Sequence, residues 1–196
     1  MSVHAPMPMT KEAFLAFIDE REERYEFVGG RAVMMVNVTR NHAVVTVGLI
    51  VALYQRLRAE QYDIAAAEFA VNVGPNIRSP DVLVQPRSSD GAALGTKSPV
   101  LIAEVLSPST PRVNFGEKRA EYFGLPSLEA YLILSADQPE AWLWQRRERE
   151  EFPSEPERIA GADQWLALNA LGIEIPLAEI YHGVCPPTDE PPARKR

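Results

Sequence analysis

The sequence predicts an α/β protein of the α+β kind, with a central mixed β-sheet flanked by helices. Two observations support this class. Apolar residues recur at helical spacing in two N-terminal segments, whereas later segments are short apolar runs bounded by glycine and proline, as is typical of strands. The elements follow in the order helix, hairpin, helix, strands, helix, strands, which favours one mixed sheet with helices packed on it.

The N-terminal part is expected to contain two helices. Thr10 can cap a helix that starts at Lys11, because its hydroxyl can accept a hydrogen bond from the first turn. Asn41 can cap a second helix over residues 42–61, where apolar residues recur at intervals of three and four.

The remaining elements are recognised by apolar runs and by turn residues. Two glycines after residue 28 can form the turn of a hairpin, and residues 86–98 have the composition of a loop. A helix is expected over residues 112–124, where a glycine ends it. The expected strands are 25–28, 31–36, 64–73, 81–85, 100–106, 128–134, 141–145 and 173–177.

Length and composition indicate one globular domain, expected over residues 11–185. Residues 1–10 are expected to form a flexible leader without the pattern of a signal peptide, and the Pro-rich residues 186–196 a disordered tail. No apolar run approaches the ~20 residues of a membrane span. The one cysteine, Cys185, excludes an intrachain disulfide and a cysteine metal cage, and it fits a reducing cytoplasm.

The formal net charge of −7 narrows the classes of partner. It argues against broad, non-specific nucleic-acid binding, which depends on clustered Lys and Arg. The negative charge is compatible with a nuclease that binds a metal ion, because the ion cancels negative charge in the site.

One acidic residue lies inside the apolar run 100–106. Burial of an unpaired carboxylate is costly, so Glu104 is expected to meet a cation, a donor or solvent. Asp81 begins another apolar segment 23 positions earlier, enough for two strands and a loop. If the two strands are neighbours, the two carboxylates converge. Two simpler interpretations stay open: Asp81 as a strand-start residue, and Glu104 in a structural salt bridge to Lys118 or an arginine.

Carboxylates that converge in this way suit Mg²⁺, for which Mn²⁺ can substitute, since Mg²⁺ commonly takes one or two carboxylates and keeps several waters. Lys118 follows Glu104 by 14 positions, on the next expected helix, and could reach the carboxylates. Hydrolysis of a phosphodiester needs a hard cation, an activated water and positive charge for the transition state. The hypothesis is therefore a metal site that cuts phosphodiester bonds.

Several short motifs, spread over roughly residues 11–180, resemble the Uma-type family of bacterial restriction endonucleases, within the PD-(D/E)XK nuclease superfamily. The most specific is the string Glu-Val-Leu-Ser-Pro-Ser-Thr from Glu104. The other motifs are Arg24-Tyr25-Glu26 with Gly30, Asn41-His42, Ser79-Pro80-Asp81, Gly116-Glu117-Lys118 with Tyr122, and Leu128-Glu129-Ala130-Tyr131-Leu132-Ile133.

The resemblance implies a restriction-endonuclease-like core in which Asp81 and Glu104 bind the metal, with the backbone carbonyl of Val105 as an extra ligand. The superfamily usually places its lysine two residues after the acid, where Leu106 stands here, so the role passes to Lys118. Glu26 matches an additional acid of such sites. His42 matches a family histidine at a helix start, and its role is open.

Two functions from different classes remain. The first is a Mg²⁺-dependent endonuclease acting on DNA, with two subunits needed to cut both strands together. The second is a non-catalytic binding or assembly module that keeps the nuclease fold, which the acidic net charge favours. Binding of Mn²⁺ discriminates between them.

Overall fold

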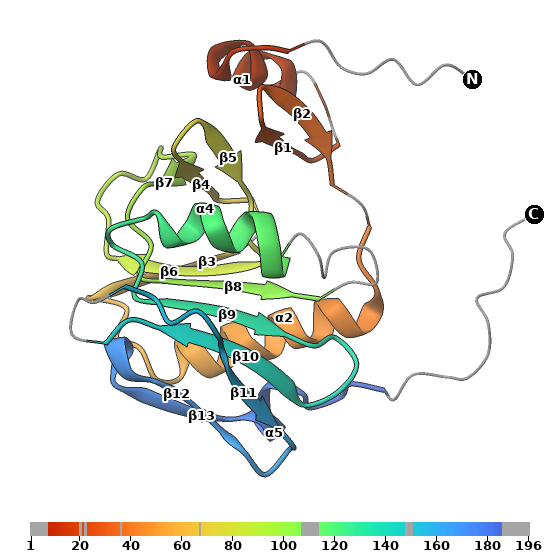
Figure 1. Cartoon of the computed structure of the whole chain (residues 1–196), viewed down its shortest axis with the longest axis vertical. Helices are drawn as coiled ribbons and strands as arrows, with labels where there is room; N and C mark the ends of the chain where they lie inside the picture. The colour runs from red at the N-terminus through yellow and green to blue at the C-terminus, as the bar shows by residue number, and fades with distance from the viewer. Residues whose placement is uncertain are drawn as a thin grey trace, which may run out of the picture.

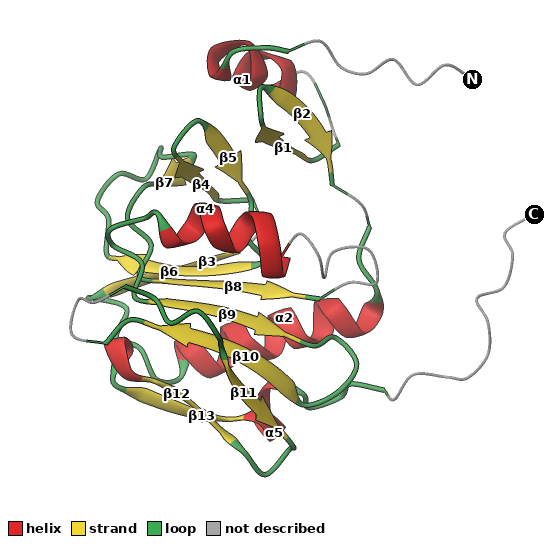
Figure 2. Cartoon of the chain, viewed as in Figure 1, coloured by secondary structure: helices red, strands yellow, loops and turns green. Residues whose placement is uncertain are grey.

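The computed structural model describes residues 8–19, 21, 23–35, 37–66, 68–106, 114–147 and 151–185. A six-stranded mixed sheet in the order β11-β10-β9-β8-β6-β3 forms its centre, and helices lie on both faces (Figures 1 and 2). This confirms the predicted class. The helices are α1 (Lys11–Asp19), α2 (Arg40–Tyr54), the π-helical turn η1 (Asn114–Lys118), α4 (Arg119–Phe123), the 3₁₀ turn η2 (Asn169–Leu171) and α5 (Leu177–Ile180).

Three strands make the middle of the central sheet. β8 (Leu101–Val105) pairs antiparallel with β6 (Val82–Pro86) and parallel with β9 (Ala130–Leu134). Both β8 and β9 are buried along their whole length, which explains why their sequences are nearly continuous apolar runs rather than alternating ones. The outer strands of this sheet are β3 (Tyr62–Ala66), β10 (Glu140–Gln145) and β11 (Glu157–Ala160).

Different helices cover the two faces of the central sheet. On one face, buried residues of α2 such as Val45 and Leu49 join α5 and the strands in one apolar cluster. On the other face, α4 packs Tyr122 against Tyr131 and Trp144. The small sheet of β12 (Trp165–Leu168) and β13 (Ile173–Pro176) contributes to the α2 side.

A second, five-stranded sheet in the order β2-β1-β5-β4-β7 lies beside α1 and packs around Phe14, Phe27 and Ile77. Its first two strands form the predicted hairpin, whose two-residue turn has positive φ at both Gly29 and Gly30, as the type I′ turn requires. The strands are β1 (Tyr25–Val28), β2 (Arg31–Met34), β4 (Ala70–Val73), β5 (Asn76–Arg78) and β7 (Gly95–Thr96).

The predicted start and end of the second helix were wrong. Thr39, rather than Asn41, is the N-cap of α2, with extended backbone and a hydroxyl that accepts from the amide of His42 at 3.2 Å. The side chain of Asn41 instead donates to the carbonyl of Cys185 at 2.8 Å. Regular helix ends at Tyr54 rather than at residue 61, and the chain then turns into β3.

The single strand predicted over residues 64–73 was also wrong. The segment divides into β3 and β4, which belong to different sheets, with a turn at Glu68 and Phe69 between them. Four short strands were not predicted: β5, β7, β11 and β12. The helix expected over 112–124 is present from residue 114, and residues 112 and 113 lie outside the described part.

The other strand predictions agree with the structure within one or two residues where it is described; residue 36 is outside it. The expected leader and tail fall mostly on residues 1–7 and 186–196, which are also outside it. Residues 8–10 are described, and the amide of Met9 donates to the carbonyl of Gly30 at 2.8 Å. Among the described residues, no helix combines the length and the apolar character needed to cross a bilayer.

Candidate active site

The strand register brings Asp81 and Glu104 to the same place. β6 and β8 pair with Val82 opposite Ala103, so continuing the register by one residue sets Asp81 opposite Glu104. The expectation that the two strands are neighbours is therefore confirmed. The amide of Val105 donates to Oδ2 of Asp81 at 2.7 Å, which fixes this carboxylate at the end of β8.

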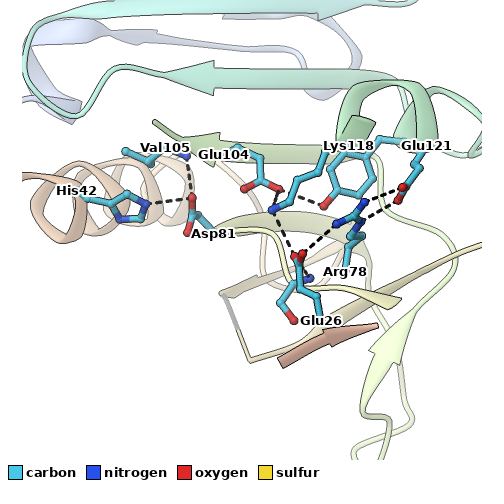
Figure 3. A network of polar contacts seen from close by, with 10 residues as sticks. Glu26, His42, Arg78, Asp81, Glu104, Val105, Lys118 and Glu121 are labelled. Atoms are coloured by element: carbon cyan, nitrogen blue, oxygen red, sulfur yellow. Dashed lines mark hydrogen bonds and ion pairs between the residues drawn. The ribbon is translucent and has the colours of Figure 1, made fainter. Parts of the chain in front are cut away.

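Glu104 is only 3% exposed and points to the face of the sheet that η1 and α4 cover (Figure 3). Its Oε1 accepts from Nζ of Lys118 at 2.9 Å and from the hydroxyl of Tyr122 at 3.0 Å. Nζ of Lys118 also lies 3.3 Å from Oε1 of Glu26 on β1. Lys118 thus joins a carboxylate from each of the two sheets.

Helical spacing explains why three side chains of this segment face the sheet together. Lys118, Glu121 and Tyr122 are related by three and four residues, so they lie on one side of the helix. Lys118 ends the π-helical turn η1, a rare backbone form that is often found at functional sites.

The burial of this cluster changes its acid–base properties. Burial raises the pKa of Glu104 from its ordinary value of 4.5 to about 7; Lys118 opposes the rise, and the carboxylates of Asp81 and Glu26 add to it. Burial also opposes the charge of Lys118, but Glu104 and Glu26 outweigh it and raise the pKa of Lys118. Lys118 therefore keeps its proton at neutral pH and acts as a cation, not as a base.

His42, in the first turn of α2, contacts the carboxylate of Asp81. Its Nε2 lies 3.3 Å from Oδ2 of Asp81, and the imidazole is buried. The cap at Thr39 positions the start of α2 at this end of the sheet. Asp81 therefore has His42 on one side and the amide of Val105 on the other (Figure 3).

Two residues of the network were not expected from the sequence: Arg78 and Glu121. Arg78, 3% exposed on β5, donates to Oε2 of Glu26 at 3.0 Å and makes two bonds to Glu121, at 2.8 Å and 2.6 Å. The guanidinium thereby ties β1 to the helix that carries Lys118. The amide of Ser79 donates to the other oxygen of Glu26 at 3.1 Å.

Two signals could have found them. Glu121 follows Lys118 by three residues, so helical spacing alone sets it on the same face as the expected lysine. Arg78 lies three positions before Asp81, next to the Ser-Pro-Asp motif. Tyr122, which belongs to the same motif as Lys118, is buried in the core and also donates to Glu104.

The charges of this network favour a bound cation. Among the described residues it holds more carboxylates than permanent cations: Glu26, Asp81, Glu104 and Glu121 against Arg78 and Lys118. No described group of three or more His, Cys, Asp or Glu side chains is spaced to hold a metal ion. A site of two carboxylates matches what Mg²⁺ takes from proteins, with waters completing its shell. Asp81 and Glu104 are the two carboxylates that such an ion would take, and this assignment stays a prediction.

The structure brings together the side chains expected from the sequence: Glu26, His42, Asp81, Glu104 and Lys118. Val105 joins them through its amide, which donates to Asp81, and the metal role of its carbonyl stays a prediction. The salt bridge of Glu104 to Lys118, left open above, is present. This salt bridge is part of a network that also includes Glu26 and Arg78, so Glu104 and Lys118 are not an isolated structural pair.

Two curated proteins of Synechocystis sp. are similar in sequence to this chain, and both are described as uncharacterised. Protein slr1290 is 27% identical over 188 residues, covering 93% of this chain and 97% of its own. Protein sll1609 is 27% identical over 131 residues, covering 64% of this chain and 74% of its own. The similarity to slr1290 extends over nearly the whole of both chains.

A solved structure from Anabaena variabilis, titled a "putative nuclease belonging to DUF820", superposes with a TM-score of 0.73 at 14% identity. The match covers 89% of this chain and 98% of that one, and it shows that the two share a restriction-endonuclease-like fold. The Uma2 family model, described as "Putative restriction endonuclease", matches residues 11–178. The chain therefore belongs to the Uma2 family.

Proposed function

We propose that this protein is a metal-dependent endonuclease that hydrolyses phosphodiester bonds in DNA, with Mg²⁺ as the natural ion and Mn²⁺ as a substitute. One observation carries the proposal. Asp81 and Glu104 lie opposite each other at one end of the central sheet, and a buried, protonated Lys118 contacts Glu104. The Uma2 family description and the fold shared with the Anabaena protein support it.

Asp81, Glu104 and the carbonyl of Val105 would hold the ion. When bound, such an ion polarises a phosphate oxygen and lowers the pKa of a bound water. Lys118 holds a fixed positive charge where negative charge develops on the phosphate, and its contacts with Glu104 and Glu26 limit its motion. Fixed charges in a dry site are effective because they need little reorganisation during the reaction.

The other side chains position these groups. His42 holds Asp81 against the amide of Val105. Arg78 joins Glu26 to Glu121, so that β1 and the helix bearing Lys118 keep a fixed spacing. Tyr122 donates to Glu104 and, because burial raises its pKa well above its usual range, remains a donor.

The part of the chain that the structure describes carries one such site, and a duplex has two strands. We infer that the active form is a homodimer in which each subunit cuts one strand. We also place the enzyme in the cytoplasm, the reducing compartment that the one cysteine predicts.

The second candidate is a catalytically inactive binding or assembly module, and the net charge of −7 favours it. The position of the two acids favours the nuclease, because a fold that binds no cation has little reason to set the half-buried Asp81 beside the buried Glu104. Calorimetric titration with Mn²⁺ separates the two, since the inactive module predicts no heat of binding.

The experiment that tests the nuclease is cleavage of plasmid DNA with Mg²⁺ or Mn²⁺, with an EDTA control. Asp81→Ala, Glu104→Ala and Lys118→Ala are each expected to lower the rate by about 10²-fold or more, as loss of a charged transition-state group does. Glu60→Ala, at an exposed turn residue, is the matched control and should cut like the wild type. Equal rates in wild type and the three site variants would assign the cutting to a contaminant.

A further inference from the structure

The strand register sets Trp142 in the same row of the central sheet as Glu104. Glu104 on β8 lies opposite Ile133 on β9, and Ile133 lies opposite Trp142 on β10. Residues directly opposite each other in neighbouring strands point to the same face of the sheet. Because neighbouring strands are about 4.8 Å apart, the backbone of Trp142 lies about 10 Å from that of Glu104.

Trp142 is not a fully buried core residue. Its indole is half-buried, whereas Trp144, two residues further along the same face of β10, is 0% exposed. Phe115 of η1 packs edge-to-face on Trp142, with ring centroids 5.3 Å apart and ring planes at 80°. Phe115 precedes Lys118 by three residues, so the turn that carries the lysine also contacts the indole. This contact fixes the indole and leaves part of its surface in contact with solvent.

Two arginines flank the indole. Arg158 on β11 lies opposite Trp142, and its side chain is 65% exposed. Its Nε donates to the buried Glu140 at 2.6 Å, which holds the guanidinium at the surface beside the indole. Arg119, the residue after Lys118, lies over the ring of Trp144, 5.6 Å from its centroid. Among the described residues Arg119 bonds to a backbone carbonyl and to no carboxylate.

We propose that the indole of Trp142 stacks on a base of a single-stranded stretch of the DNA substrate, and that Arg119 and Arg158 bind the phosphates of that strand. An exposed aromatic ring between cations is typical of surfaces that bind single strands, because every base has a face that can stack. In a duplex the bases stack on one another and are not available to the indole. The inference rests on the proposed function and adds that the cleaved strand is unpaired near the cut.

The charge and the spacing both suit this role. The carboxylates of the candidate site repel a phosphate backbone, so cations beside the site are needed to hold the strand. One strand of duplex DNA advances about 3.4 Å per nucleotide, so the distance of about 10 Å from Glu104 corresponds to about three nucleotides. An extended single strand covers this distance in fewer. The stacked base is therefore expected within about three nucleotides of the cleaved phosphate.

The first test uses the fluorescence of the protein's own tryptophans, which are Trp142, Trp144 and Trp165. Oligothymidylate of about 12 nucleotides is added in EDTA at low salt, so that binding is measured without ion-dependent cleavage. Stacking should quench the emission of the wild type. Trp142→Phe should lose most of this quenching, because the stacked indole is gone. Trp165→Phe, at a 58% exposed tryptophan on β12, is the matched control and should keep it.

The second test measures affinity from the anisotropy of a labelled oligothymidylate. Trp142→Leu should weaken binding about 5- to 150-fold, the range found for loss of one stacked base, and Trp165→Leu should not weaken it. Trp142→Phe keeps a ring and should bind almost as the wild type does. Urea unfolding curves check that each variant is folded. A duplex of the same length should compete at least tenfold less well than the single strand.

Several results would overturn the proposal: a wild type that does not bind the single strand, quenching that survives Trp142→Phe, or equal competition by the duplex. Unchanged affinity in Trp142→Leu, together with weaker self-association in sedimentation, would assign this surface to a contact between subunits instead. Asp81, Glu104 and Lys118 are intact in every variant and no cleavage is measured, so failure here leaves the nuclease to the plasmid assay. A protein that binds through Trp142 and never cuts would be the binding module.

Discussion

Replacing Glu104 by glutamine should stabilise the metal-free protein at pH 8.5 far more than at pH 4.5. In the folded protein, burial and the carboxylates of Asp81 and Glu26 raise the pKa of Glu104 to about 7, although Lys118 lowers it. In the unfolded chain the pKa of Glu104 has its ordinary value of 4.5. One pKa step corresponds to ~1.4 kcal/mol, so the buried carboxylate costs about 3 kcal/mol once it is fully ionised. Glutamine has no such cost.

The sign follows from which state loses its proton first. As the pH rises from 4.5, the unfolded chain releases the proton of Glu104 while the folded protein keeps it until about pH 7. The wild type therefore loses stability across this window and no further above it. In the wild type Lys118 stays protonated across this window, because burial lowers its pKa but Glu104 and Glu26 raise it above its ordinary value of 10.5.

Urea unfolding in EDTA at the two pH values measures the effect. The difference in unfolding free energy between Glu104→Gln and wild type should grow by about 3 kcal/mol from pH 4.5 to 8.5, which corresponds to roughly 6–12 °C in Tm for a chain of this size. Acids that are not coupled to Glu104 cancel in the comparison. Glu60→Gln, an exposed control, should show no such growth. An equal difference at both pH values would refute the reasoning.

Three other variants test separate parts of the structure. Arg78→Met should lower the unfolding free energy, measured in urea, by about 3–5 kcal/mol, because two carboxylates lose their buried partner. Arg78→Lys should not restore this stability. A loss under about 1 kcal/mol would contradict this role of Arg78. Gly48→Ala should cost about 1–3 kcal/mol by forcing α2 from α5, whereas Gly91→Ala, with open space around it, should be near neutral by the same assay. Lys118→Met should abolish cleavage yet still bind Mn²⁺ in calorimetry; loss of binding would make Lys118 a structural part of the ion site.

The geometry of the candidate site could be predicted because it follows from local rules. Two acids at the ends of neighbouring strands converge by strand register, and the side chain of a lysine on the next helix reaches back to the sheet. Asp81, Glu104 and Lys118 therefore followed from pattern and resemblance together. Glu26 came from the resemblance alone, since nothing local in the hairpin indicates that β1 approaches the central sheet.

The features that could not be predicted depend on contacts between segments far apart in the sequence. The segment 64–73 alternates as a strand should, but no local signal shows that the chain leaves one sheet at Ala66 and joins another at Ala70. The role of Arg78 becomes clear only from its contacts with Glu26 and Glu121. Thr39 and Asn41 are both good capping residues, and the choice between them was decided by the contact of Asn41 with Cys185.

A crystal soaked with Mn²⁺ tests whether a cation is held between Asp81 and Glu104. We expect an anomalous peak bound by both carboxylates, with Lys118 still against Glu104. No peak at saturating Mn²⁺, or a peak elsewhere with these two side chains unchanged, would contradict it.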